Sequence, residues 1–327
     1  MAKNGKIIVL EEDQGRRLDV FLSEKLEISR SQVLKMIKRG QVLINDKNPK
    51  KPGELMKEGF LIVIKEEEKI VPSSYGVPSE DVKDLRSDVK IIKEESEYLV
   101  VEKPAGMLVH PTEAGEPNTL ADFLLEKYPE IKKVGDSPDV RPGIVHRLDK
   151  EASGLLVVAR TQKMFKHLKK QFQDRTVEKE YGVLVYGAIE KEHNIIDFDI
   201  DRGASGKMVA RPKIDLLKIK NVGKGQEGRE SLTEFWVEKD FARFSLLRVK
   251  IHTGRTHQIR VHMFAFGHPV VGDTLYFNKN LIKRTEQKLG RLFLHARKLC
   301  FEDLKGKKVC FESGFPEKLK KYFDKLK

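Results

Sequence analysis

Residues 142–160 read PGIVHRLDKEASGLLVVAR. Near the centre, His146, Arg147 and Asp149 place three polar or charged side chains within four residues. The apolar run over residues 155–159 follows directly and predicts a buried strand that holds this loop rigid. Asp149 is therefore either an ordinary loop carboxylate paired with an arginine or a group that carries out a reaction.

The overall charge points to a polyanionic partner. The chain has 327 residues, enough for one large and one small domain. Lysine and arginine number 63 against 50 aspartate and glutamate residues, a formal net charge of +13. This excess favours nucleic acid binding. The alternative is a lysine- and glutamate-rich surface from a heat-loving source, which explains the abundance of charge better than its positive excess.

The sequence also bears on location. No run approaches 18 uninterrupted apolar residues, so we expect no membrane span. The first residues, MAKNGKIIVLEEDQ, lack the apolar segment and cleavage site of a secretory signal. Cys300 and Cys310 flank a hairpin turn predicted at Lys305 and Gly306, and we expect both to be core thiols in a reducing cytoplasm. These features predict a soluble, cytoplasmic protein.

Residues 1–65 predict a small α+β domain. Apolar residues recur at helical spacing in two segments, and the second helix has Ser29 or Ser31 as its N-cap and Gly40 at its end. The strands QVLIND and FLIVIK follow. A single lysine is usually part of a solvated face, but basic residues gather on the second helix and the connection after it. From this helix we expect nucleic acid contacts by Arg30, Lys35, Lys38 and Arg39.

A polar segment with two prolines over residues 66–90 reads as a linker, and residues 91–327 as a larger domain. Strands alternate irregularly with a few helices there, which favours an α+β fold over a doubly wound sheet. The first predicted elements are a strand over 91–103, a strand-like run over 107–111, a helix over 118–128 capped by Asn118, and a helix over 162–173 capped by Thr161.

Several chemistries are disfavoured by spacing. The sequence contains neither GxGxxG nor GxxxxGK[ST], the phosphate-binding patterns of nucleotide-dependent enzymes. His252, His257 and His262 are five residues apart, which fits neither a helical pair nor a zinc site, so interior or phosphate-contacting histidines are favoured. Ser153 lies in ASG and not in a GxSxG elbow. We predict no metal site.

Residues 252–273, HTGRTHQIRVHMFAFGHPVVGD, predict a helix from about Thr256 to Gly267. Arg255 falls at its start and Arg260 inside it, among apolar residues. A buried guanidinium is costly without a carboxylate partner, and Asp149 is the predicted partner. An ion pair that only stabilises the fold is the alternative.

A family resemblance bears on these alternatives. HRLDKEASGLLVVA resembles the HRLDxxTSGLLxxA signature of the RluA/RluD family of RNA pseudouridine synthases. Further stretches match that family in its order: VVEKPAGMLVHP, KEYGVLVYG, HTGRTHQIRVHMFAFGHPVVGD and RLFLHA. Residues 16–65 resemble the S4 RNA-binding domain that often precedes this catalytic domain. The departures are Ala152 in place of threonine, a longer Lys/Gly-rich segment over residues 212–230, and Glu302-Asp303 in place of His-Pro.

The resemblance implies a mixed, mainly antiparallel sheet and isomerisation of uridine to pseudouridine in RNA, without a cofactor, by a monomer. It implies that Asp149 is the catalytic carboxylate, which attacks C1′, attacks C6, or assists loss of uracil as a glycal forms. Tyr181 would stack on the target base and handle the C5 proton, and Arg260 would pair with Asp149. Leu294 would line the pocket, and Arg147 would occupy the space that the uridine leaves. The further substrate-binding residues are His146, Arg255 and His257.

The expected substrate is large-subunit ribosomal RNA, and transfer RNA is the second candidate. The S4-like domain resembles the one in family members that act on large-subunit ribosomal RNA. Two other functions stay open. One is a binding-only ribosome-assembly factor with the same fold, and the other is a metal-dependent nuclease. The nuclease would require a carboxylate cluster, whereas the quoted motifs place a single aspartate beside arginines.

Overall fold

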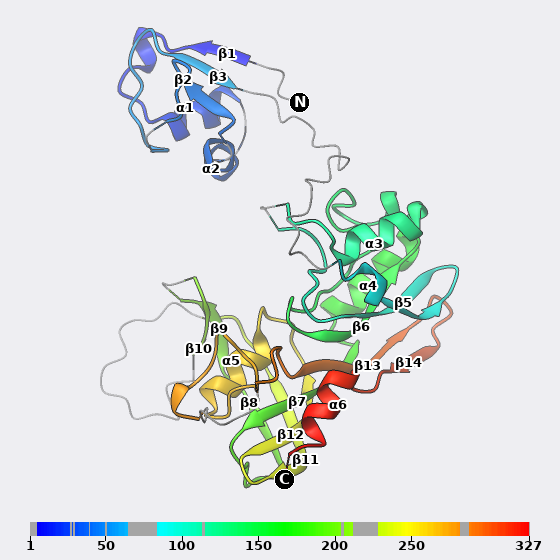
Figure 1. The fold of residues 1–327 in the computed structure, drawn as a ribbon. Coiled ribbons are helices and arrows are strands. Elements are labelled where there is room, and N and C mark those ends of the chain that lie inside the picture. Colours follow the sequence, from blue (N-terminus) through cyan, green and yellow to red (C-terminus); the bar gives the residue numbers. More distant parts are fainter. Residues whose placement is uncertain are drawn as a thin grey trace. The chain divides into compact units, whose positions relative to one another are not determined.

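The structure, a computed structural model, describes residues 5–64 except 27, 29, 39 and 50, and residues 84–112, 115–203, 206–211, 228–281 and 288–326. The chain divides into two compact units, Met1–Val82 and Lys83–Lys327 (Figure 1). The division falls inside the predicted linker, most of which lies outside the described residues, as do residues 212–227 of the Lys/Gly-rich segment.

The first unit is a small α+β domain. Its antiparallel sheet has the order β1-β3-β2, with β1 at Gly5–Ile8, β2 at Val42–Ile44 and β3 at Leu61–Ile64. The helices α1 (Leu18–Lys25) and α2 (Arg30–Lys38) complete it. The core contains Leu18, Phe21, Leu22, Val33 and Ile62. Gly40 has a φ of +70°, as expected of a glycine after a helix. Ser29 and the Ser31 side chain lie outside the described residues.

The second unit is built on one large sheet. Its order is β4-β5-β6-β13-β7-β12-β11-β8, and β14 pairs with β13. Only β6 and β13 run parallel among these pairs. The bounds are β4 Lys90–Glu94, β5 Tyr98–Lys103, β6 Ser153–Ala159, β7 Glu178–Tyr186, β8 His193–Ile196, β11 Thr233–Phe241, β12 Phe244–Ile251, β13 Leu294–Glu302 and β14 Lys308–Glu312. The predicted α+β class with a mixed, mainly antiparallel sheet is confirmed.

Four α-helices and a separate hairpin flank this sheet in the described part of the unit. The helices are α3 (Leu120–Lys127), α4 (Gln162–Gln173), α5 (Gln258–Ala265) and α6 (Glu317–Phe323), and the hairpin is formed by β9 (Asp199–Arg202) and β10 (Met208–Arg211). Figure 1 shows α3 and α4 near β5 and β6, and α5 near β9 and β10. Residues of β7 alternate between the main core, which contains Val183 and Val185, and a cluster with α6, which contains Leu184 and Tyr186.

Close backbone approach joins the loop of residue 149 to the middle of the sheet. Gly154 has a φ of +122°, and a Cβ there would lie 2.4 Å from the Ala296 carbonyl oxygen. The parallel pairing of β6 with β13 consists of His295 opposite Ser153 and Ala296 opposite Gly154. Glycine is therefore required where β6 begins, and this contact fixes where the strand and the preceding loop lie.

Some predicted elements differ in the structure. Residues 91–103 are not one strand, because β4 and β5 form an antiparallel hairpin. Residues 107–111 form no strand. Thr119, not Asn118, caps α3: its hydroxyl accepts from the Asp122 N–H, and the Asp122 carboxylate accepts in return from the Thr119 N–H. Asn118 has a φ of +60° and lies outside the helix. Thr161 caps α4 as predicted.

The expectation of free thiols is wrong. Cys300 and Cys310 form a disulfide. The two residues lie opposite each other in the β13–β14 hairpin, with Cα atoms 4.1 Å apart, so the pairing register brings the sulfur atoms together. The sequence predicts this hairpin, but the contact of the two cysteines depends on its register, Cys300 opposite Cys310. Separately, the helices in the described ranges are all too short or too polar to cross a membrane.

Candidate active site

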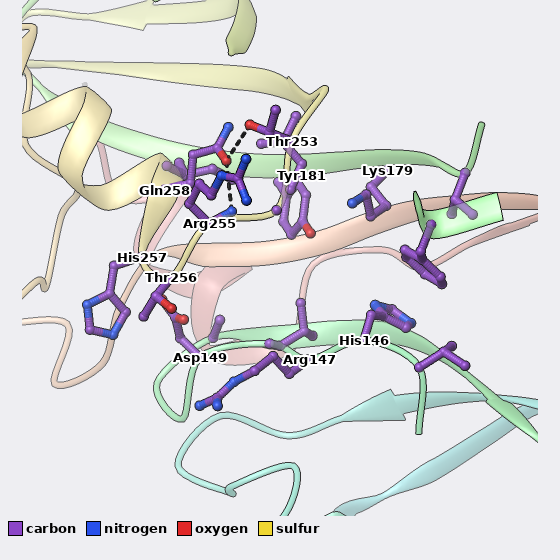
Figure 2. A pocket seen from close by; sticks show the side chains of 18 of the residues that line it. His146, Arg147, Asp149, Lys179, Tyr181, Thr253, Arg255, Thr256, His257 and Gln258 are labelled. Atoms are coloured by element: carbon purple, nitrogen blue, oxygen red, sulfur yellow. Dashed lines mark hydrogen bonds between the residues drawn. The ribbon is translucent and has the colours of Figure 1, made fainter. Parts of the chain in front are cut away.

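A pocket of about 590 Å³ in the second unit gathers the residues singled out from its sequence. The loop of residues 145–152, which we call the aspartate loop, forms one wall; β7 and the turn before α5 form the other (Figure 2). All eight residues predicted to act on or bind the target nucleotide line it: His146, Arg147, Asp149, Tyr181, Arg255, His257, Arg260 and Leu294.

The aspartate loop is held from beneath by a buried lysine. Lys103 ends β5 and is fully buried. Its ammonium donates to four carbonyl oxygens, those of Pro104 (2.8 Å), Met107 (2.9 Å), Lys150 (3.3 Å) and Ala152 (2.7 Å). Burial lowers the Lys103 pKa to about 7 and the Arg291 charge adds to that effect, while the charges of Asp149 and Glu151 oppose it. The loop backbone therefore has a fixed position next to Asp149.

Arg260 is the buried cation of the site. It lies on α5, is 1% exposed, and places Nη1 3.2 Å from Asp149 Oδ2. The predicted contact between these side chains is thus confirmed. Nε and Nη2 donate to Asp273 Oδ2 and Oδ1, at 2.7 and 2.9 Å. Burial alone would lower the Arg260 pKa, but the hydrogen bonds and charge of Asp273, together with Asp149, raise it. The guanidinium therefore stays charged, and Asp273 fixes its orientation.

Tyr181 lies on β7, opposite the aspartate loop. Its side chain is buried, and Figure 2 shows its hydroxyl end pointing to the side of the pocket where Arg147 and Asp149 lie. Burial raises the pKa of the phenol, and the Asp149 charge adds to that effect. The side chain thus stays a neutral phenol, with an apolar ring for stacking and a hydroxyl that can exchange a proton.

The turn before α5 completes the wall that β7 begins. The Gln258 side chain accepts hydrogen bonds from the Thr253 hydroxyl (2.7 Å) and the Arg255 N–H (3.0 Å), as Figure 2 shows. His257, with a φ of +55°, precedes the helix, which begins at Gln258 and not at Thr256. The Arg255 Nε donates to the Glu230 carbonyl. These bonds hold the backbone of the turn beside the pocket.

His146 is built into the fold. Its Nε2 accepts a hydrogen bond from the Val157 N–H at 3.0 Å, and its ring stacks on Phe172 at 4.6 Å. Burial lowers the His146 pKa to about 3, so the ring is neutral. Arg147, by contrast, is exposed. The first side chain anchors the aspartate loop to β6, and the second is free to meet a ligand at the pocket mouth.

Of the four nucleic acid contacts predicted in the first unit, the structure describes one side chain. Arg30 is exposed and donates to Asp19 at 2.8 Å, and Arg17 binds the same buried carboxylate. The side chains of Lys35, Lys38 and Arg39 lie outside the described residues. Over the described ranges of the whole chain, no three His, Cys, Asp or Glu side chains are grouped as metal ligands would be.

Three residues of the site escaped the sequence reasoning: Lys103, Lys179 and Asp273. All three lie inside stretches that match the family: Lys103 in VVEKPAG, Lys179 in KEYG and Asp273 in PVVGD. The signal that could have found Asp273 is charge balance. A helix that buries an arginine among apolar residues needs a carboxylate nearby, and Asp273 was the nearest one along the chain.

Comparison with known proteins agrees with this geometry. The family model of RNA pseudouridylate synthase matches residues 97–265, and that of the S4 domain matches residues 16–59. A protein of Aquifex aeolicus described as an uncharacterized RNA pseudouridine synthase is 38% identical over 96% of this chain and 95% of its own length. The ribosomal large subunit pseudouridine synthase D of Neisseria meningitidis serogroup B is 36% identical over 92% of this chain and 76% of its own.

A solved structure agrees as well. Human RNA pseudouridylate synthase domain containing 1 superposes with a TM-score of 0.55 at 26% identity, covering 72% of this chain and 87% of its own. The chain therefore belongs to the RNA pseudouridine synthase family and carries an S4 domain near its N-terminus. It is an isomerase that converts uridine to pseudouridine in RNA.

Proposed function

We propose that this enzyme modifies large-subunit ribosomal RNA and that Asp149 is its catalytic carboxylate. The observation that carries the proposal is the contact of Asp149 with the buried Arg260 at the wall of the pocket. The guanidinium holds an ionised carboxylate at a fixed place in a partly water-excluded site, where it can reach the ribose or the base of a flipped uridine.

The other lining residues have complementary roles in this proposal. Tyr181 stacks on the uracil and handles the C5 proton, and Leu294 supplies an apolar wall. Arg147 takes the place of the uridine in the RNA helix after the base has left its stack. Taking the base out of the stack costs on the order of a few kcal/mol. His146, Arg255 and His257 shape the pocket and contact the nucleotide.

Ribosomal RNA is favoured over transfer RNA by two facts. Relatives named for the large ribosomal subunit align with nine-tenths of this chain, and the chain has the S4 domain. The proposed division of labour is an RNA-binding unit at residues 1–65, a linker at 66–90 and a catalytic unit at 91–327. We also propose that the enzyme acts as a monomer. Ribosomal RNA as substrate favours a cytoplasmic location.

The test combines a variant with a map of modified sites. Asp149→Asn should abolish pseudouridine formation in an unmodified large-subunit transcript and leave RNA binding within about threefold, because the amide keeps the shape but not the charge. Pseudouridines should also be mapped in a strain that lacks the gene. Full activity of Asp149→Asn would refute the catalytic role. Loss of a site in transfer RNA alone would refute the ribosomal assignment. Wild-type binding without any isomerisation would favour an assembly factor.

A further inference from the structure

Lys179 is a further cation in the pocket, and the roles proposed so far leave it unused. It lies on β7 two residues before Tyr181, so both side chains project from the same face of the strand. It lines the pocket, and Figure 2 shows it beside Tyr181, across from His146. The strand that presents the stacking ring therefore also presents an ammonium group.

This ammonium has no anionic partner among the described residues. Lys103 is satisfied by four carbonyls and Arg260 by carboxylates, but Lys179 only lies over the Phe172 ring, 5.4 Å from its centroid. Burial lowers its pKa to about 8. A largely buried cation without a hydrogen-bonding partner is unfavourable, and a ligand oxygen that enters the pocket would relieve that cost.

The position favours a base oxygen over a phosphate. Two residues along a strand span roughly 6–7 Å, so the polar edge of a pyrimidine stacked on Tyr181 comes within reach of the Lys179 ammonium. The phosphates belong to the RNA backbone, which stays outside the pocket, so they lie at the pocket mouth. Arg141 and Arg147, which line the pocket and are exposed, are the cations placed to meet them.

We propose that Lys179 donates a hydrogen bond to a carbonyl oxygen of the target uracil and stabilises the negative charge that the ring acquires during isomerisation. The inference rests on the proposed role of the pocket. If the C1′–N1 bond breaks first, its electron pair stays on N1 and is shared with O2 and O4. If Asp149 adds to C6, an enolate places the charge on O4. In each route the C1′–N1 bond breaks, C1′ bonds to C5, C5 releases a proton and N1 gains one. Where Asp149 has added to C6, that bond breaks again and returns the free carboxylate, so no redox partner is needed.

The experiment separates binding from chemistry. Lys179→Met and Lys179→Arg are compared with wild type on the unmodified large-subunit transcript, by RNA affinity and by single-turnover rate. We expect Lys179→Met to slow the single-turnover step by about 100- to 1,000-fold, the usual effect of losing one oxyanion donor, with RNA affinity within about threefold. Lys179→Arg should recover part of the rate. Lys307→Met, which removes an exposed lysine from the β13–β14 turn, is the charge-matched control and should match wild type.

Two outcomes would overturn the inference. One is an unchanged single-turnover rate with weakened RNA binding, which would make Lys179 a phosphate contact. The other comes from transcripts with 2-thiouridine or 4-thiouridine, whose sulfur is a weaker acceptor. At least one of them should slow wild type much more than Lys179→Met, and equal sensitivity of both enzymes to both analogues refutes the hydrogen bond. Asp149→Asn is run in parallel, since its activity would refute the proposed function and not this inference alone.

Discussion

Asp273 holds the Arg260 guanidinium through two parallel hydrogen bonds, of 2.7 and 2.9 Å, and both side chains are almost completely buried. With Nε and Nη2 bound to Asp273, the third nitrogen of the guanidinium, Nη1, lies 3.2 Å from Asp149 Oδ2. A bidentate pair fixes the plane of the guanidinium, which a single contact cannot do. The geometry of the reacting carboxylate therefore depends on a second carboxylate that lies deeper in the protein.

Removing the deeper carboxylate should harm both stability and activity. We expect Asp273→Ala to lower the free energy of unfolding by about 3–5 kcal/mol, because it leaves the Arg260 charge buried with only its outer partners. The residual activity of the folded enzyme should fall as well. Urea denaturation and single-turnover rates measure the two effects. Glu151→Gln is the matched control. Glu151 Oε2 lies 3.5 Å from Arg260 Nη1, but the Glu151 side chain is 45% exposed. Removing its charge should therefore lower the free energy of unfolding by less than about 1 kcal/mol. Equal effects of the two variants would contradict this account.

Arg147 should matter most when the target uridine is stacked in a helix. The side chain is exposed at the pocket mouth, and its proposed task is to fill the gap that base flipping leaves. Arg147→Ala should therefore slow modification of a helical substrate by about tenfold or more. It should have a smaller effect on an RNA whose target uridine is already unpaired, since little stacking energy is lost there. The two rates are compared on matched hairpins. An equal loss on both would make Arg147 a plain phosphate contact.

The buried Lys103 predicts a pH-dependent stability. Its pKa is about 7 in the folded protein, against 10.5 for an exposed lysine, so between these values the unfolded state binds more protons. Stability therefore rises with pH across the window from 7 to 10.5. The Lys103→Met variant lacks this pH-dependent stabilisation and leaves four carbonyls without a donor. Each of these carbonyls that water does not reach lowers the free energy of unfolding by about 1–3 kcal/mol. Unfolding curves at pH 7 and pH 10 should show the deficit of the variant growing with pH. A constant deficit would contradict the shift.

The prediction from sequence succeeded where local patterning and capping determine the secondary structure. The run over residues 155–159 became part of β6, whose seven residues are all buried, and Thr161 caps α4 with its hydroxyl. Apolar patterning and capping act over a few residues, so the sequence contains the whole signal. The pairing of Asp149 with Arg260 was within reach for another reason, because burying a guanidinium demands a carboxylate.

The prediction from sequence failed where contacts between distant segments determine the structure. β1 forms because β3 offers an edge to pair with, and four residues starting at Gly5 carry too little pattern of their own. Lys103 lies in a strand as predicted, but its ammonium binds carbonyls up to 49 residues away, and no local pattern predicts that contact. The Cys300–Cys310 bond depends on which residues of a hairpin face each other, and a one-residue change of register would separate them. Such contacts follow from the assembled sheet.

The disulfide has a consequence that reductant can test. It closes a loop of ten residues, for which the chain-entropy argument gives about 2–3 kcal/mol of stabilisation. We expect dithiothreitol to lower the unfolding free energy of wild type by that amount and to leave Cys310→Ser unaffected, because the variant has no bond to reduce. Leu294, which lines the pocket, lies at the opposite end of β13 from the β14 turn, so pseudouridine formation at 25 °C should be the same for both proteins. A Cys310→Ser variant that is as stable as wild type without reductant would contradict the stabilising role of this bond.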